Sequence, residues 1–334
     1  MTETNKAKKE FPKSLLAPKY WGGWLVAGIL FLLVKIVPYR WLMRFGAKLG
    51  WLFVKLMPYR CLVAETNIRL CFENTDKDWQ TIYQNHLKSL GKGFFEMSMA
   101  WFLPSSYFTD KVVHIGHEDV DKALKSGRGV MFLGMHTTGL DFGSPLLNNR
   151  YPTYFMYQPA RNLLFNHIIV RGRLRHCTGL IEQDNMRELL MRLKKGDCVW
   201  YGCDQDFGRR TKSVFAPFFG VQTFTLPYYA KIAKKTGAAV IPVVGLRDDK
   251  TGQFIVKYLP EISVDNLTDE QAAQQMNHAI EQMLDGYEDQ YYWVHRRFKT
   301  RPKGESDIYP IKPSHLRRQQ REAKRLARQK ANND

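Results

Sequence analysis

The sequence predicts an α/β protein in which a mostly parallel central sheet is flanked by helices and preceded by an N-terminal membrane-associated helical segment. From residue 112 onward, short apolar runs of strand length alternate with longer segments that have helical periodicity. Glycines such as Gly127, Gly196 and Gly237 close several of the helical segments. A separate apolar run lies near the N-terminus, between Trp21 and Val34. Together these observations favour a sheet protein with an attached helical segment.

Length and composition narrow the class of protein. The 334 residues suffice for one large domain or two modest ones. Hydrophobic residues make up 44% of the chain, which is too few for a polytopic membrane protein. The net charge of +18 and the isoelectric point near 9.6 imply an anionic partner, which can be nucleic acid, an anionic membrane, or a phosphorylated or acidic substrate.

The cysteines form no recognisable disulfide framework, because their number is odd. Cys198 and Cys203 lack CxxC spacing, and no histidine lies close by to complete a zinc site. We expect reduced thiols and a cytosolic environment for the folded part of the chain. The five cysteines are Cys61, Cys71, Cys177, Cys198 and Cys203.

The first 60 residues are a candidate membrane-binding segment. A lysine-rich tail over 1–19 leads into the apolar run, which Lys35 interrupts and which is at the short end for a spanning helix. Residues 41–57 resemble a basic amphipathic helix that lies in a headgroup layer rich in anionic lipid. Basic residues on both sides of the run leave its orientation open. The alternative is a helical hairpin packed on the domain itself, but we expect membrane attachment, because so apolar a segment is costly to leave in water.

The segment over 65–104 is predicted to be helical, and Pro104 ends it. Beyond it, apolar runs predict strands, and segments of helical periodicity predict helices. The predicted strands cover 112–115, 129–135, 152–156, 199–201, 239–244 and 254–258. The predicted helices cover 119–125, 162–175, 186–195, 226–236 and 269–285. Pro242 predicts a bulge or a sheet edge within its strand.

A basic C-terminal extension over 314–334 follows an α/β domain that we predict over 61–313. The extension carries no aromatic residue on which a nucleic-acid base can stack. We therefore expect a helix at an anionic membrane surface or a solvated tail, and no nucleic-acid partner.

A candidate catalytic pair follows the strand predicted over 129–135. His136 leaves this strand at the edge of the sheet where open α/β proteins keep their sites. Asp141 lies five residues on, and on one continuous helix that step turns the two side chains roughly 140° apart. They can meet if His136 precedes the helix, so that His136 acts as a general base and Asp141 fixes its tautomer. A histidine and an aspartate at this spacing also occur by chance.

Arginines follow the strand predicted over 152–156. Arg171 and Arg175 are four residues apart and share a helix face, which suits a clamp for phosphate or carboxylate. A solvated basic face is the equal alternative. The arginines of this stretch are Arg161, Arg171, Arg173 and Arg175.

The strand predicted over 199–201 runs into an acidic loop that carries Asp204 and Asp206, followed by Arg209 and Arg210. Two carboxylates are too few to predict a metal site. We expect them to order the loop and to position the two arginines.

The chain has no G-x-S-x-G elbow, no P-loop and no G-x-G-x-x-G motif. A general base is therefore predicted without an obvious protein nucleophile. The simplest chemistry is deprotonation of a substrate hydroxyl by His136, after which that hydroxyl attacks an acyl donor directly.

Four blocks in this order resemble the bacterial lipid A biosynthesis acyltransferases of lauroyl and myristoyl type, within the wider lysophospholipid and glycerol-phosphate acyltransferase superfamily. The resemblance covers roughly residues 105–305, and the last block is the most specific. The blocks are His-x₄-Asp at 136–141, Asp-Gln-Asp-x-Gly at 204–208, Ile-Pro-Val at 241–243 and Trp-Val-His-Arg-Arg-Phe-Lys-Thr-Arg-Pro at 293–302. Many lipid A enzymes carry glutamate where this chain has Asp141, which leaves the acceptor subclass open.

The resemblance implies a late acyltransferase on the cytoplasmic face of the inner membrane, with no cofactor and no covalent acyl-enzyme. It would move a fatty acyl group from acyl carrier protein or acyl-CoA to a hydroxyl of an anionic glycolipid, a lipid A precursor. A lysophospholipid or an ornithine-type lipid is the alternative acceptor. The positive net charge fits a polyanionic acceptor and an acidic carrier protein. The resemblance makes His136 and Asp141 the catalytic dyad and puts Arg171, Arg173, Asp204, Asp206, Arg209 and Arg210 in regions that bind polar substrate.

Overall fold

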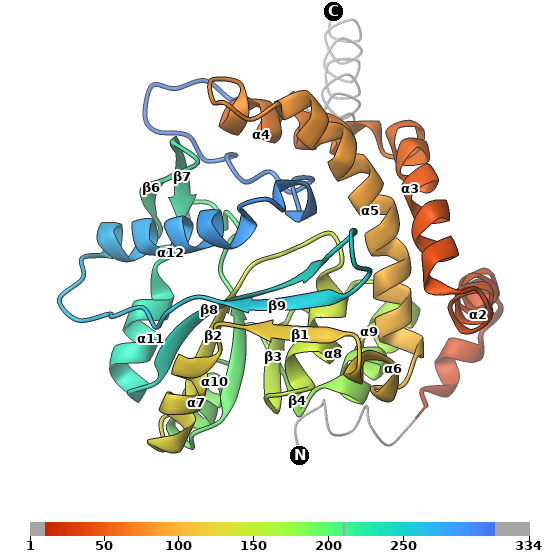
Figure 1. Ribbon diagram of the computed structural model, residues 1–334, viewed down its shortest axis with the longest axis horizontal. Coiled ribbons are helices and arrows are strands. Elements are labelled where there is room, and N and C mark those ends of the chain that lie inside the picture. Colours follow the sequence, from red (N-terminus) through yellow and green to blue (C-terminus); the bar gives the residue numbers. More distant parts are fainter. Residues whose placement is uncertain (1–10, 210, 311–334) are drawn as a thin grey trace, which may run out of the picture.

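The computed structural model describes residues 11–209 and 211–310. Seven strands form its central sheet: β1 Val112–Ile115, β2 Val130–Gly134, β3 Thr153–Tyr157, β4 Gly179–Glu182, β5 Cys198–Gly202, β8 Ala239–Arg247 and β9 Phe254–Tyr258. Their order is β1-β9-β8-β2-β5-β3-β4 (Figure 1). Neighbouring strands of this sheet are parallel except for the antiparallel pair of β8 and β9. The mostly parallel sheet that the sequence predicts is therefore confirmed.

Helices cover both faces of this sheet, which buries its central strand completely. Every residue of β2 is buried. Met131 and Leu133 belong to a core shared with α10, α11 and α12, whereas Val130 and Phe132 belong to a second core shared with α7 and α8. These helices are α7 Glu118–Lys125, α8 Gly143–Asn148, α10 Met186–Lys194, α11 Tyr228–Thr236 and α12 Asp269–Leu284, and the short α6 Ser106–Thr109 and α9 Leu163–His176 complete the domain.

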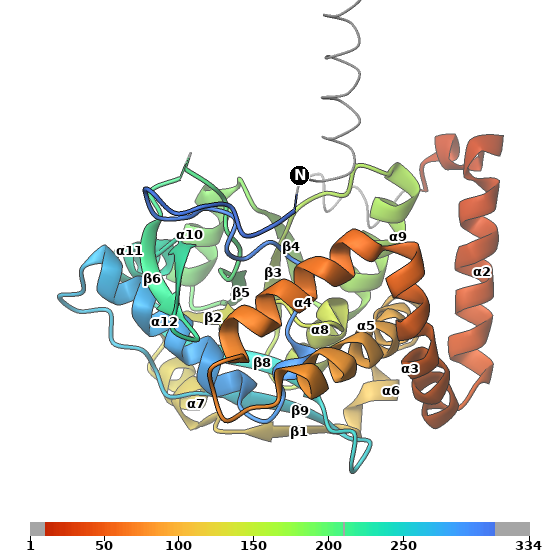
Figure 2. The ribbon, with the colours of Figure 1, turned by 90° about the horizontal axis from the view of Figure 1, so that it is seen from above.

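Within the described residues, four long helices precede the sheet: α2 Trp21–Ile36, α3 Tyr39–Leu56, α4 Pro58–Phe72 and α5 Trp79–Phe102. α3 packs on α5 so closely that the backbones touch at glycines. A Cβ atom on Gly50 would lie 1.9 Å from the carbonyl oxygen of Leu87, so no larger residue fits there. α2 lies outside α3, at the margin of the molecule and away from the sheet (Figures 1 and 2).

The apolar N-terminal helix is largely exposed. Within the described residues, Pro18–Ile36 is the one helical segment long and apolar enough to cross a membrane, and only 6% of its most apolar window is buried. α3 is amphipathic: glycines and apolar residues face α5, and tryptophans alternate with basic residues on the opposite face. The exposed residues of α3 include Trp41, Arg44, Phe45, Lys48, Trp51, Leu52 and Lys55.

The structure differs from the sequence prediction at several elements. The helical region over 65–104 is two helices, because α4 ends at Phe72 and Asp78 caps a new helix by accepting from two backbone amides. β4 and a two-stranded hairpin, β6 Val214–Phe218 with β7 Val221–Thr225, were not predicted; these strands are only four or five residues long. All five cysteines are buried, and no disulfide joins any two of them. The predicted extension over 314–334 lies outside the described residues.

Pro242 lies in a central strand, so the predicted bulge or sheet edge is wrong. β8 has β2 on one side and β9 on the other. The ladder with β9 begins only at Val243, and the carbonyl of Pro242 accepts a hydrogen bond from Leu259. Because proline has no N–H, Pro242 and Leu259 are joined through this carbonyl alone, at the point where the ladder with β9 ends.

Candidate active site

A short turn carries His136 out of the sheet after β2. The turn is held by the backbone of a distant segment: the carbonyl of His136 accepts from the amide of Tyr292 at 3.0 Å, and Thr137 forms an antiparallel bridge with Tyr291. The amide of Thr138 donates to the carbonyl of Gln290 at 2.8 Å. The histidine side chain is 19% exposed, so the turn presents a fixed but accessible imidazole.

The carboxylate against this imidazole is Asp204, which follows the neighbouring strand β5. The parallel register pairs Gly134 with Gly202, and both functional residues come two positions later. Oδ1 of Asp204 lies 2.5 Å from Nδ1 of His136, and Oδ2 accepts the backbone N–H of His136 at 2.9 Å. The backbone N–H and the side-chain Nδ1 of His136 are therefore both hydrogen-bonded to the same carboxylate.

Asp204 is ionised in this position. Burial by itself raises the pKa of its carboxyl group, but the charge and the hydrogen bonds of His136 and the buried charge of Arg297 outweigh burial and lower the pKa below its usual range. An ionised carboxylate can only accept hydrogen bonds, so Nδ1 of the imidazole carries a proton, and in the neutral form of the ring Nε2 carries none. Nε2 is then the acceptor, and no group in the described residues hydrogen-bonds it.

Asp141 makes different contacts. It is buried, and it lies in a short 3₁₀ turn over Leu140–Phe142. Its Oδ2 accepts from the indole N–H of Trp101, and its Oδ1 accepts from Nε of Arg173 at 2.9 Å and from a second nitrogen of the same guanidinium. Within the described residues, no hydrogen bond joins it to His136. The structure therefore pairs His136 with Asp204, whereas the sequence predicts a pair with Asp141.

Asp141 does not pair with His136 because strong hydrogen-bond donors reach its carboxylate from two helices. α5 and α9 bring an indole and a guanidinium to Asp141, and these strong donors hold its carboxylate. The sequence does not reveal that residues 32 and 40 positions away supply these donors.

His136, Asp141 and Arg173 line one cavity of about 670 Å³ at the carboxyl ends of the strands. The lining combines polar groups with many apolar and aromatic side chains. Its apolar lining includes Met135, Leu147, Phe155, Met156, Trp200, Leu226, Val243 and Val256. Such a cavity suits a ligand with a long apolar part and a polar reacting end.

The other predicted site residues lie elsewhere. Arg171 is exposed on α9 and does not line the cavity. Asp206 is buried and accepts from the backbone and the hydroxyl of Thr300, so it anchors the C-terminal segment. Arg209 is exposed and donates to the carbonyl of Arg301. Arg210 lies outside the described residues.

Several lining residues were not singled out from the sequence. Gln205 and Phe207 face the cavity from the acidic loop, and Tyr292 reaches it from the segment that holds the His136 turn. The only available signal for Asp204 as the partner of His136 was that each follows an apolar strand, which acquires meaning once those strands are known to be neighbours. No group of three or more metal-binding side chains gathers in the described part of the chain.

The chain is similar to known proteins along most of its length. Residues 8–300 match the family model described as bacterial lipid A biosynthesis acyltransferase. The chain is 33% identical over 302 residues to a lipid A biosynthesis palmitoleoyltransferase of Escherichia coli (strain K12), covering 90% of this chain and 98% of the relative. It is also 33% identical over 303 residues to a lauroyltransferase of that organism, with the same coverage, and 26% identical over 319 residues to its myristoyltransferase, covering 91% and 96%.

Proposed function

Because the chain belongs to the bacterial lipid A biosynthesis acyltransferase family, we propose that it transfers a fatty acyl group to a hydroxyl of a lipid A precursor, with His136 as general base. The donor would be acyl carrier protein or acyl-CoA. The observation that carries this proposal is the imidazole of His136, oriented by a buried carboxylate at the wall of a largely apolar cavity.

The reaction follows from the protonation state of this pair. Nε2 of His136 takes the proton of the acceptor hydroxyl as its oxygen attacks the carbonyl carbon of the thioester. Asp204 stabilises the imidazolium that forms. The tetrahedral intermediate then collapses, the carbon–sulfur bond breaks, and the imidazolium returns its proton to the leaving thiolate. An ester and a free thiol result, with no acyl group held by the protein.

Asp141 acts in this proposal through Arg173. The carboxylate holds the guanidinium at the cavity wall, where a fixed cation stabilises the negative charge that develops on the attacked carbonyl oxygen or neutralises an anionic group of the acceptor. Asp141 is then a positioning residue, and Arg173 is the group that contacts substrate. Arg171 and Arg209, which do not line the cavity, remain candidates for contacts with the polyanionic headgroup, and Arg210 remains one on the sequence alone.

The apolar part of the cavity would hold the acyl chain. Leu147, Val243 and Val256 contribute to its lining. The relatives named for palmitoleoyl and lauroyl transfer are equally similar to this chain, so similarity does not choose between acyl groups. The shape of this apolar part is the physical property that would set chain length.

The first 60 residues would attach the enzyme to the inner membrane at its cytoplasmic face, leaving 61–313 as the acyltransferase domain. α2 exposes most of its apolar residues, and α3 exposes aromatic and basic residues together. That combination is favourable at a surface of anionic lipid. The exposed apolar residues of α2 are Trp21, Leu25, Val26, Ile29, Phe31, Leu32 and Ile36.

Replacing the catalytic histidine tests the proposal. His136→Ala should lower kcat by about 10²–10⁴, the contribution expected of a general base. His278→Ala, on an exposed histidine of α12, is the matched control and should keep full activity. Both proteins are assayed with two donors, acylated acyl carrier protein and acyl-CoA. The acceptors are a lipid A precursor, a lysophospholipid and an ornithine-type lipid. Full turnover by His136→Ala would refute the mechanism, and turnover only with another acceptor would correct the substrate.

A further inference from the structure

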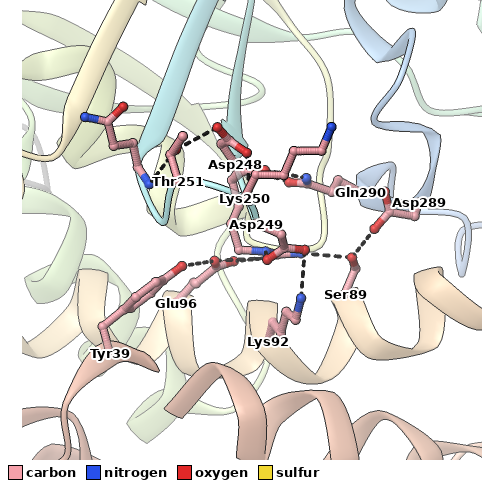
Figure 3. A network of polar contacts seen from close by, with 12 residues as sticks. Tyr39, Ser89, Lys92, Glu96, Asp248, Asp249, Lys250, Thr251, Asp289 and Gln290 are labelled. Atoms are coloured by element: carbon pink, nitrogen blue, oxygen red, sulfur yellow. Dashed lines mark hydrogen bonds and ion pairs between the residues drawn. The ribbon is translucent and has the colours of Figure 1, made fainter. Parts of the chain in front are cut away.

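A largely buried polar network lies between α5, the end of β8 and the segment just before Tyr292 (Figure 3). None of its members lines the cavity. Its centre is a buried ion pair, and its far end reaches the first residue of α3. The members are Tyr39, Ser89, Lys92, Glu96, Arg247, Asp249, Asp289 and Gln290.

The central pair is Arg247 with Glu96. Their side chains are only 2% and 4% exposed, and one guanidinium nitrogen lies 2.9 Å from each carboxylate oxygen. The other guanidinium nitrogens donate to Ser89 and Asp249, both at 2.9 Å. A buried ion pair contributes little net stability, so we interpret this one as fixing the arrangement of α5 and the end of β8.

Gln290 connects this pair to the backbone of the His136 turn. Its side-chain oxygen accepts from the backbone N–H of Arg247 at 2.9 Å, and its side-chain nitrogen donates to the backbone carbonyl of the same residue at 2.8 Å. Its own backbone carbonyl accepts from Thr138 at 2.8 Å. One side chain therefore sets the register between β8 and the segment that pairs with His136.

The network also contacts the turn directly from α5. A Cβ atom on Gly93 would lie 2.2 Å from the carbonyl oxygen of Thr138, so helix and turn backbones touch. A Cβ atom on Gly139 would lie 2.8 Å from a carboxylate oxygen of Glu96. The turn is thus held between α5 on one side and residues 290–292 on the other.

We propose that Gln290 is a positioning residue for acyl transfer, and that the Arg247–Glu96 pair keeps the strand end to which it binds in place. This inference rests on the proposed role of His136 as general base. Gln290 touches neither substrate nor imidazole, and its effect reaches the reaction through the backbone of residues 136–138.

The test compares two substitutions at this position. Gln290→Leu removes both side-chain hydrogen bonds, and Gln290→Glu keeps an acceptor but removes the donor. A misplaced general base should lower kcat by roughly 10- to 100-fold in Gln290→Leu, with less loss in Gln290→Glu, while KM stays within about twofold. Gln274→Leu and Gln274→Glu, on an exposed glutamine of α12, are the matched controls. Thermal unfolding establishes that each protein is folded at the assay temperature.

A second measurement separates positioning from a general loss of stability. If Gln290 acts through His136, its substitution should cost much less in an Asp204→Asn background, where the imidazole has already lost its orientation. Additive losses, or a kcat unchanged in a folded Gln290 variant, would overturn the inference. Should Gln290→Leu not fold, the isosteric Gln290→Glu decides by the same criteria. Normal turnover by His136→Ala would instead refute the proposed function itself, so the two failures are distinguishable.

Discussion

Two buried aspartates lie at the same edge of the sheet, and their neighbours give them different roles. Asp204 is 2% exposed and faces a titratable ring, whereas Asp141 is 4% exposed and faces a guanidinium and an indole. Their burial is nearly equal, so the partner decides what each carboxylate does. A carboxylate against an imidazole selects its tautomer, and a carboxylate against a guanidinium fixes the place of a permanent cation.

The comparison teaches that spacing in a motif does not identify contact in the fold. The two residues of the His-x₄-Asp block both line the cavity, yet each takes its partner from another part of the chain. The site is better described as two pairs, His136 with Asp204 and Asp141 with Arg173. Substitutions can separate these pairs.

The largest expected effect is on the first pair. Asp204→Asn replaces an acceptor-only carboxylate by an amide that can donate to Nδ1, so the imidazole is no longer held with Nε2 as the acceptor. We expect kcat to fall by about 10²–10⁴, a loss comparable to that of the base itself. Steady-state kinetics measures it, with Asp265→Asn on an exposed aspartate as the control. If Asp204→Asn kept an activity close to that of the unmodified enzyme, Asp204 would not have the role that distinguishes it from Asp141.

A smaller loss is expected from the second pair. Asp141→Asn and Arg173→Gln each remove a charge-assisted contact at the cavity wall and should lower kcat/KM roughly 10- to 100-fold. Because both changes disable one unit, the double variant should lose little more than either single variant. A double-mutant cycle measures this coupling. Fully additive losses would mean that Asp141 acts independently of Arg173.

A substitution at Gly143, which belongs to neither pair, should affect which acyl chain is used rather than the chemistry. A Cβ atom on Gly143 would meet nothing within 4 Å, and this residue lines the cavity. Gly143→Leu fills apolar space, so kcat/KM for long acyl donors should fall by roughly tenfold relative to short donors, since each methylene buried contributes about 0.8 kcal/mol. Competition between donors of different length measures the ratio. An unchanged ratio would place the acyl chain elsewhere.

The smallest expected effect concerns stability and involves neither pair. Burial lowers the pKa of His86, His176 and His295 to about 4. Between about pH 6.5 and 4 the unfolded chain binds more protons than the folded one, so the free energy of unfolding should fall as pH falls through this window. The pair of Asp204 with His136 should not lose the aspartate charge there, because the pKa of Asp204 is lowered below its usual range. Denaturant unfolding at pH 5, 6 and 7 measures the slope, and His86→Gln should reduce it.

Much of the fold was predictable because its signals are local. The run over β2, the helix-ending Gly237 and the alternation after residue 112 need no tertiary information. β4 and the β6–β7 hairpin were not predicted, and their length is not the reason, because β1 and β2 are equally short and were predicted. The prediction at Pro242 was wrong because a proline is accepted in a central strand where the neighbouring strand ends, and the sequence does not show where β9 ends.

The site was predictable in part for the same reason. His136 was identified because it follows a buried strand, whereas Asp204, which follows another, was expected only to order its loop and to position two arginines. Their direct contact depends on β2 and β5 being neighbours in register, which no pattern in either strand encodes. The donors to Asp141 come from α5 and α9, and Gln290 comes from a segment with no regular structure after it.

The central claim is that Asp204, and not Asp141, holds the proton of His136 on Nδ1. Nitrogen NMR of ¹⁵N-histidine-labelled enzyme reports this directly, with the His136 signals assigned by their loss in His136→Ala. We predict a protonated, hydrogen-bonded Nδ1 in the unmodified enzyme and in Asp141→Asn, and its disappearance in Asp204→Asn. The opposite pattern, with the Nδ1 proton lost in Asp141→Asn and kept in Asp204→Asn, would contradict the account.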